Sequence, residues 1–238
     1  MRDINVFGNI GKCFWDEDSM SAADFAKLLK EADGDDVTIH INSGGGNVFD
    51  ANTMAETLRA YKGRTVASIE GLAASAASYF ALTADEVVIG PSALFMIHNP
   101  YTYASGEAKD MRKAADLLDM LRTTISDQYV KKTGMGRDEV EALMDEETWF
   151  TAEEAVERGF ADRLSDAEPV AACVDRRALD KFKHAPEGIA GTGGAPAGEV
   201  GKTIAPSTGE PSTGAVADEA GAASRVVCVN GAFLRVEG

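Results

Sequence analysis

The sequence predicts an α/β fold with a largely parallel sheet, and three observations lead to this prediction. Residues 37–42 alternate β-branched apolar and polar side chains with a period of two, as a half-buried strand does. Residues 107–131 repeat apolar side chains at the spacing of an amphipathic helix. Stretches of these two kinds alternate along residues 1–170, which is the pattern of βαβ units.

We place the boundaries of the expected elements from capping residues and from the strand and helix periodicities. Ser21 and Asp24 have the spacing of a capping box, as do Thr151 and Glu154, so we expect a helix to begin at each pair. In chain order we expect strands at residues 3–7, 37–42, 65–70, 86–89 and 94–97, and helices at residues 21–32, 48–61, 74–82, 107–131, 137–144 and 151–158.

Composition divides the chain into four parts. Residues 1–170 form the α/β domain, and residues 171–184 are a boundary segment. Residues 185–224 consist largely of Gly, Ala, Pro, Ser and Thr and contain no aromatic side chain, so they bury too little apolar surface to offset the entropy of ordering. We expect them to be a disordered linker. Residues 225–238 are apolar again, and the turn pair Asn230-Gly231 predicts a short hairpin that docks on another element.

Charge and composition disfavour several classes of protein. The formal net charge of −16 disfavours binding to nucleic acid or to an anionic membrane surface. The first residues, MRDINVFGNIG, lack the apolar core of a signal peptide, and no stretch of about 18 apolar residues is present to span a membrane. Three widely spaced cysteines indicate a reducing compartment, so we expect a cytoplasmic protein.

The first candidate site is a glycine-rich turn, Asn42-Ser43-Gly44-Gly45-Gly46, between a predicted strand and a predicted helix. Backbone N–H groups in such a turn can stabilise an anion, either a phosphate or a developing oxyanion. The spacing of a P-loop is missing, as is that of a dinucleotide-binding turn. A flexible βα turn without a function is the alternative interpretation.

Ser75 and His98 also lie at junctions of strands and helices. Ser75 stands among alanines, which leave room for a substrate backbone, although a serine here can be a simple helix cap. Ser78 is the local alternative as a nucleophile, but it lies inside the predicted helix. His98 ends an apolar strand before a proline, where functional side chains are common, although a lone histidine is often structural. No pair of side chains has a metal-ligand spacing, so we expect neither a metal nor another cofactor.

A third group is the acidic run Asp145-Glu146-Glu147, which can equally be a solvated turn beside a helix. Taken together, the candidates supply a nucleophile, a base, an orienting acid and a turn able to stabilise an oxyanion. They occur in the chain order serine, histidine, acid.

Four segments in this order resemble the ClpP proteases. INSGGGNVFDA resembles their INSPGG segment, with Gly44 in place of proline, and GLAASAAS resembles the segment of their nucleophile. FMIHNP is similar to their histidine segment, and ETWFTAEEAVERGFADRL to the stretch around their catalytic aspartate. The likeness covers residues 4–164. More narrowly, the chain resembles the ClpP-related head-maturation (prohead) proteases of tailed phages.

The resemblance implies a ClpP/crotonase fold of stacked ββα units and a serine endopeptidase. It implies that the enzyme processes phage capsid or scaffold proteins in the host cytoplasm or within the prohead, and that it forms a homo-oligomeric ring. Glu147 stands where the family has an aspartate, which leaves Asp145 as the alternative acid. The remaining roles that the resemblance implies are Ser75 as nucleophile, His98 as general base, Gly46 and Ala76 as oxyanion donors, and Gly45 as the residue that shapes the turn.

Two other functions remain open at this point. A crotonase-fold enzyme acting on an acyl thioester also uses a glycine turn as an oxyanion hole, but it needs no Ser–His pair. A catalytically silent capsid-assembly protein can retain a protease domain as a relic. The presence of both Ser75 and His98 favours the peptidase.

Overall fold

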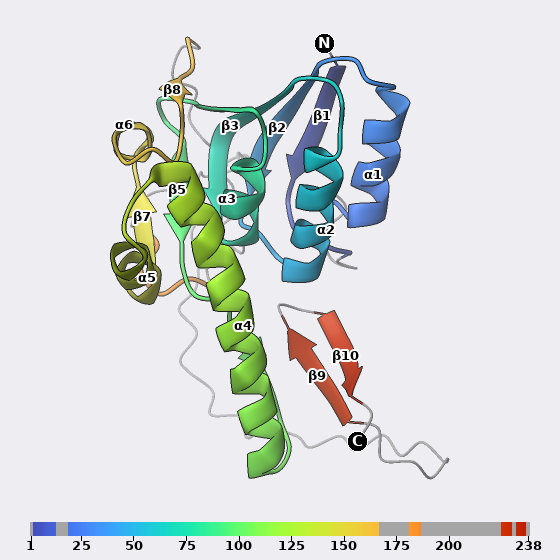
Figure 1. Ribbon diagram of the computed structural model, residues 1–238, viewed down its shortest axis with the longest axis vertical. Coiled ribbons are helices and arrows are strands. Elements are labelled where there is room, and N and C mark those ends of the chain that lie inside the picture. Colours follow the sequence, from blue (N-terminus) through green and yellow to red (C-terminus); the bar gives the residue numbers. More distant parts are fainter. Residues whose placement is uncertain (1, 13–18, 167–180, 187–224, 230–231, 237–238) are drawn as a thin grey trace, which may run out of the picture.

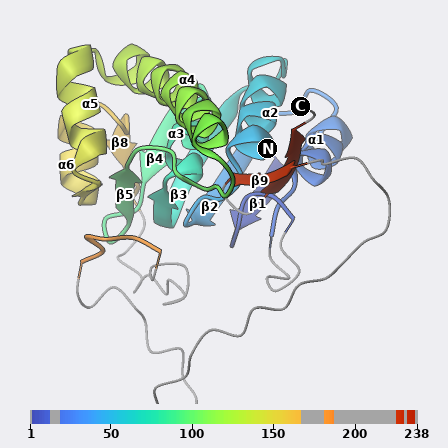
Figure 2. The same ribbon diagram turned by 90° about the horizontal axis from the view of Figure 1, so that it is seen from below.

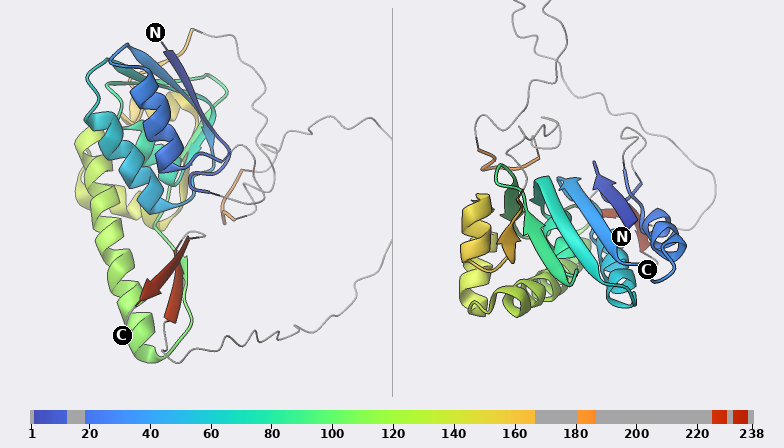
Figure 3. Two further views of the ribbon diagram at one scale, coloured as in Figure 1. Left: turned by 90° about the vertical axis from the view of Figure 1, so that its right-hand side faces the viewer. Right: turned by 90° about the horizontal axis from the view of Figure 1, so that it is seen from above.

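The computed structural model describes residues 2–12, 19–166, 181–186, 225–229 and 232–236. A seven-stranded sheet forms the centre of the molecule (Figure 1). The helices lie on one face of this sheet and residues 181–186 on the other, as the views from below and from above both show (Figures 2 and 3). The predicted α/β class with a largely parallel sheet is confirmed.

One strand, β3, organises the sheet. Its first half pairs in parallel with β4 over residues 66–69, and its second half pairs in parallel with β5 over residues 72–74. The latter register places the ends of β3 and β5 side by side. The parallel strands follow the order β1 (Arg2–Phe7), β2 (Val37–Ser43), β3 (Thr65–Ala74), β4 (Glu86–Ile89) and β8 (Arg163–Leu164), while β5 (Leu94–Ile97) joins β3 to the antiparallel β7 (Thr148–Phe150).

Capping residues define the helices much as the sequence predicts. Ser21 Oγ accepts a hydrogen bond of 3.2 Å from the N–H of Asp24, and Thr151 with Glu154 forms a complete capping box. The longest helix ends at Gly134, which has a left-handed φ of 75°. The helices are α1 (Ala22–Glu31), α2 (Val48–Arg59), α3 (Ala76–Ala81), α4 (Ala108–Thr133), α5 (Arg137–Asp145) and α6 (Ala152–Glu157).

Alternation along β3 and β5 separates two apolar clusters. Ala73, Phe95 and Ile97 belong to the main core under the helices. The neighbouring side chains point to the opposite face of the sheet, where Leu72, Ala74 and Met96 pack with Phe182 and are fully buried. An element distant in sequence therefore covers the second face at this point.

A smaller antiparallel sheet stands beside α4 (Figures 1 and 3). It consists of β6 (Thr102–Tyr103), β9 (Arg225–Val229) and β10 (Ala232–Val236), with β9 in the middle. β9 and β10 pair as the two arms of a hairpin, although Asn230-Gly231 lies outside the described residues. The partner of this hairpin is β6, which begins four positions after His98.

Several expected boundaries are wrong. The strand expected at residues 65–70 continues to Ala74, and the helix expected from residue 74 begins only at Ala76. The helix expected at residues 107–131 runs from Ala108 to Thr133. Three strands of two or three residues, β6, β7 and β8, were not expected, because so few residues show no period.

The predicted linker is described only at its first two residues. Ala185 and Pro186 belong to the described segment on the sheet face. Ala185 packs against the apolar cluster of Leu72, Ala74, Met96 and Phe182. The remainder, 187–224, lies outside the described residues, as do residues 167–180. No helix in the described ranges is long and apolar enough to cross a membrane.

Candidate active site

Ser75 occupies a strained turn between β3 and α3. Its φ of 56° and ψ of −125° lie outside the regions that non-glycine residues favour. The turn is held by a hydrogen bond of 3.1 Å from the N–H of Ser75 to the carbonyl oxygen of Met96. Although Ser75 is the N-cap residue of α3, its side chain makes no capping hydrogen bond. Its hydroxyl is therefore available for another role.

His98 is the partner of that hydroxyl. Because Ala74 of β3 is in register with Met96 of β5, the residues that follow these two strands come close to each other. The distance from His98 Nε2 to Ser75 Oγ is 2.7 Å, which is a hydrogen bond. The structure thus brings together two residues that lie 23 positions apart in the chain.

The surroundings of His98 keep its ring neutral. Burial, helped by the nearby charges of Lys181 and Lys183 and opposed by the charge of Glu147, lowers the pKa of His98 from 6.5 to about 4. A neutral imidazole has one ring nitrogen free to accept a proton. The Ser75–His98 pair therefore has the geometry and the charge state of a nucleophile and its general base.

The glycine turn packs directly on the turn of Ser75. A Cβ atom on Gly45, which has a φ of 82°, would lie 2.6 Å from the carbonyl oxygen of Ala74 and 2.7 Å from the nitrogen of Ala76. Only glycine fits there. Gly46 follows with a φ of 152°, and Ala76, as the first residue of α3, has an N–H without an acceptor inside its helix. The glycine turn and the turn of Ser75 are therefore in direct contact.

Glu147 lies close enough to His98 to raise its pKa electrostatically. The residue is buried, with 8% of its surface exposed, and its φ of 50° is left-handed. Its Oε1 accepts a hydrogen bond of 2.7 Å from the N–H of His184 and a longer one of 3.5 Å from Trp149 Nε1. Among the hydrogen bonds of the described residues, none joins Glu147 to His98.

The alternative acid, Asp145, has a different set of contacts. Its Oδ1 accepts a hydrogen bond of 2.7 Å from Asn99 Nδ2 and lies 3.0 Å from Arg122 Nη2 on α4. Its side chain is about half exposed. Asp145 therefore ties the residue after His98 to the long helix, and it is more than the solvated carboxylate of an open turn.

Ser78, the alternative nucleophile, is fully buried beneath the turn. Its hydroxyl donates to the carbonyl oxygen of Ser75 at 2.6 Å and lies 2.7 Å from the hydroxyl of Tyr129 on α4. A serine with both contacts inside the core supports the conformation of Ser75 and cannot reach a substrate.

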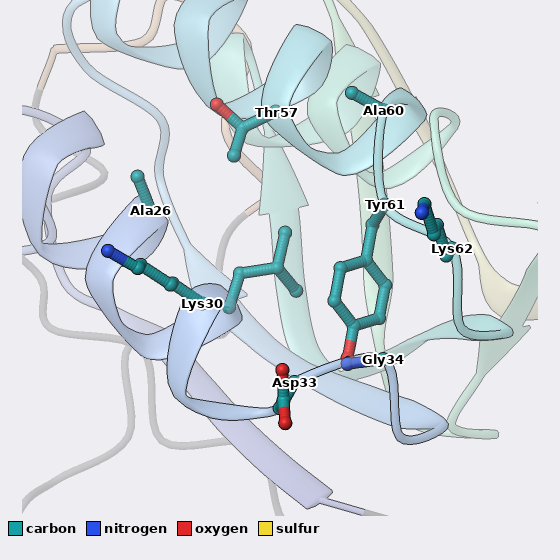
Figure 4. A pocket seen from close by; sticks show the side chains of 9 residues that line it. Ala26, Lys30, Asp33, Gly34, Thr57, Ala60, Tyr61 and Lys62 are labelled. Atoms are coloured by element: carbon teal, nitrogen blue, oxygen red, sulfur yellow. The ribbon is translucent and has the colours of Figure 1, made fainter.

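Sequence reasoning missed the pocket beside Ser75. Helices α2, α3 and α4 contribute to this pocket, and no local motif connects their positions. A larger cavity of about 430 Å³ lies elsewhere, between α1 and α2, with Tyr61 and Asp33 among its lining residues (Figure 4). No group of three or more His, Cys, Asp or Glu side chains in the described ranges is arranged to hold a metal. The pocket beside Ser75 is lined by Val48, Ser75, Ala76, Tyr79, His98, Pro100, Ile125 and Tyr129.

The sequence profile of the Clp protease family matches residues 15–168. The chain belongs to the Clp protease family. It is 31% identical over 147 residues to the ATP-dependent Clp protease proteolytic subunit 1 of Leifsonia xyli subsp. xyli, covering 60% of this chain and 75% of that relative. Membership of the Clp protease family supports a serine peptidase.

A solved structure is similar in fold. A single-substitution mutant of ClpP1 from Listeria monocytogenes superposes with a TM-score of 0.60 at 23% identity, covering 70% of this chain and 92% of that one. Clp proteases are oligomers that act on protein substrates, so the family also supports protein as the class of substrate.

Proposed function

We propose that the protein is a serine endopeptidase in which Ser75 is the nucleophile and His98 the general base. The observation that carries this proposal is the hydrogen bond of 2.7 Å between Ser75 Oγ and the neutral ring of His98. The strained turn that presents Ser75 and the absence of a capping bond from its side chain support the same assignment.

The chemistry follows from the positions of these groups. As Ser75 Oγ bonds to the carbonyl carbon of the peptide, His98 Nε2 takes the hydroxyl proton. The carbonyl oxygen becomes an oxyanion, which the N–H groups of Gly46 and Ala76 stabilise. His98 then gives its proton to the leaving amine as the C–N bond breaks. Water, activated by the same ring, hydrolyses the ester formed on Ser75.

Glu147 is the acid that we assign to this reaction. When His98 accepts the proton its ring becomes positive, and a buried carboxylate nearby stabilises that charge more strongly than a solvated one does. Asp145 has a separate role, because its carboxylate is bonded to Asn99 and paired with Arg122. We therefore expect Glu147 to contribute more to catalysis than Asp145.

The finer proposal is that the protein processes capsid or scaffold proteins of a phage during prohead maturation, in the cytoplasm of the host or inside the prohead. The narrower resemblance of the chain to head-maturation proteases, in which the WFTAEEA type of segment is common, supports it. A homo-oligomeric ring is part of the same proposal, since α4 exposes Met111 and Met120, with 36% and 61% of their surface accessible. Such side chains are suited to contacts between subunits.

A fluorophosphonate probe tests the core of the proposal, because it labels only an activated serine. The intact chain should be labelled, and Ser75→Ala should abolish labelling and peptide hydrolysis while the fold is retained. Ser78→Ala tests the alternative nucleophile: it should still be labelled at Ser75, although more slowly, because the Ser78 hydroxyl supports the turn. Labelling that survives Ser75→Ala would refute the assignment, and an unlabelled but active enzyme would instead favour chemistry on acyl thioesters.

Co-expression with candidate capsid and scaffold proteins tests the choice of substrate. We expect one of these proteins to be shortened by the active chain and to stay intact with Ser75→Ala. If the probe labels Ser75 but every capsid and scaffold protein remains intact, the peptidase assignment stands and the phage substrate is wrong.

A further inference from the structure

Residues 181–186, which we call the strap, cross the sheet face opposite the helices (Figures 2 and 3). Phe182 of the strap is buried, with 8% of its surface exposed, on the cluster of Leu72, Ala74 and Met96. The centroid of its ring lies 5.6 Å from that of His98 and 5.4 Å from that of Trp149, with both rings in edge contact. The ring of Phe182 thus covers the side of the His98 ring that faces the strap.

The strap also binds the loop of the proposed acid. The N–H of His184 donates to Glu147 Oε1 at 2.7 Å, and His184 Nδ1 donates to the carbonyl oxygen of Glu146 at 2.8 Å. A hydrogen bond from a backbone N–H to a buried carboxylate is strong and directional. The hydrogen bond from His184 therefore holds the side chain of Glu147, whose backbone has a left-handed φ.

The pocket beside Ser75 lies away from the strap. The pocket beside Ser75 is lined from α2, α3 and α4, which cover the other face of the sheet. The aromatic contacts of Phe182 are with His98 and Trp149. The strap therefore lies behind the reacting groups and leaves open the side from which a peptide would approach.

We infer that the strap is a part of the catalytic centre, in which Phe182 shields the His98–Glu147 pair from water and the N–H of His184 holds the carboxylate of Glu147. Phe182 and His184 are positioning residues, because they act through His98 and Glu147. This inference rests on the proposed peptidase function, and it assigns a role to a segment that lies beyond the four ClpP-like motifs.

The charges around His98 determine the direction of the expected effect. The groups that face it are Ser75, Glu147 and Tyr101 from the body of the protein and Lys181 and Lys183 from the strap. Burial and the two lysines lower the pKa of His98, and Glu147 raises it. Loss of the Phe182 ring admits water, and loosening of the strap removes the lysines. Both changes raise the pKa of His98 towards its ordinary value of 6.5.

The decisive test substitutes Phe182 in the full chain. Phe182→Ala should move the acid limb of the fluorophosphonate labelling rate up by about one pH unit or more, and lower the rate at about pH 5 about twofold or more. Phe182→Leu retains an apolar cover and should restore most of the rate. Leu28→Ala is the control for losing an apolar side chain, because Leu28 lies on α1 and is 37% exposed.

A second readout does not depend on catalysis. The chain has three histidines, so NMR can follow the titration of each ring in a Ser75→Ala background, with His98→Gln used to identify the signal of His98. The midpoint for His98 should rise in Phe182→Ala and stay low in Leu28→Ala. The titration of His98 does not require Ser75 to be a nucleophile. It therefore tests the role of the strap separately from the peptidase proposal.

A pair of substitutions at position 184 tests the clamp on Glu147 without disturbing the buried ring. His184→Pro removes the N–H donor, whereas His184→Ala keeps that donor and removes only the side chain. We expect His184→Pro to label at least about tenfold more slowly than His184→Ala. Equal rates for this pair, or an unchanged His98 titration in a folded Phe182→Ala, would overturn the inference. So would a Phe182→Ala enzyme that is faster than the native one, which would make the strap an inhibitor.

Discussion

Gly45→Ala tests how closely the glycine turn supports the nucleophile. The added Cβ would lie 2.6 Å from Ala74 O, 2.7 Å from Ala76 N and 2.9 Å from Ser75 Cβ, distances that real Cβ atoms essentially never show. The neighbours are mainly backbone atoms of the strained turn, which cannot move aside without moving Ser75. We therefore expect a loss of function together with a loss of stability.

The stability effect has two parts that a control can separate. A left-handed φ costs an alanine about 1 kcal/mol relative to glycine, and forced overpacking adds roughly 1–3 kcal/mol. Gly34 has a similar φ of 88°, but a Cβ placed there would meet no atom within 4 Å. Gly34→Ala should therefore cost only the first part, and Gly45→Ala about 2–4 kcal/mol in total.

Thermal unfolding and probe labelling measure the two consequences. For a chain of this size, each kcal/mol lowers Tm by about 2–4 °C, so the two variants should differ clearly in melting temperature. Displacement of the oxyanion donors should slow labelling of Gly45→Ala by about 10²–10³-fold, whereas Gly34→Ala should label normally. If Gly45→Ala were labelled at the native rate, the glycine turn would not support Ser75 as we describe.

Two further predictions concern the acids and His40. Glu147→Gln should keep the fold and lower kcat about 10²–10⁴-fold, and Asp145→Asn should cost less; the reverse order of kcat values would move the role of orienting acid to Asp145. His40 has one ring nitrogen 2.5 Å from Glu70 and the other 3.2 Å from Asp3. Burial alone would lower the pKa of His40, but these two carboxylates outweigh it and raise the pKa above 6.5. The stabilisation from His40 should therefore be complete below its ordinary pKa of 6.5 and lost as the pH rises through the raised pKa. The melting temperatures of the native chain and of His40→Gln should converge at high pH. A difference in melting temperature that does not change with pH would contradict this.

The elements that the sequence predicts well are those with their own periodicity or caps. Residues 37–42 alternate cleanly and form β2, and the capping pairs at Ser21 and Thr151 begin α1 and α6. The second half of β3 was missed for a physical reason. Gly71-Leu72-Ala73-Ala74 contains no β-branched residue, and it is a strand because it pairs with β5 and, at Ala73, with β2. Such pairing is tertiary, so no local signal reveals it.

In the candidate site, too, local signals were predictable and tertiary contacts were not. Motifs and chain order single out Ser75 and His98, but their contact depends on the register between Ala74 and Met96. The strap falls at the predicted boundary between domain and linker, because Lys181-Phe182-Lys183-His184 has no periodicity. The one available signal was Phe182 itself, a large apolar side chain in a polar stretch directly before residues without any aromatic side chain. A side chain of that kind usually needs a buried place.

Backbone strain supports the site independently of any resemblance to other proteins. Within the described ranges, the non-glycine residues with positive φ are Asp33, Ser75 and Glu147. Asp33 precedes Gly34 in an exposed turn after α1, where a left-handed aspartate is common. Ser75 and Glu147 are different, because each follows a regular element that ends close to the site and each is held there by tertiary hydrogen bonds. Strain of this kind costs about 1–3 kcal/mol for each residue and persists only where the surrounding structure enforces it. One strained residue is hydrogen-bonded to His98 and the other lies close enough to raise its pKa, which favours Glu147 over Asp145 as the partner of His98, since Asp145 lies within the regular turns of α5.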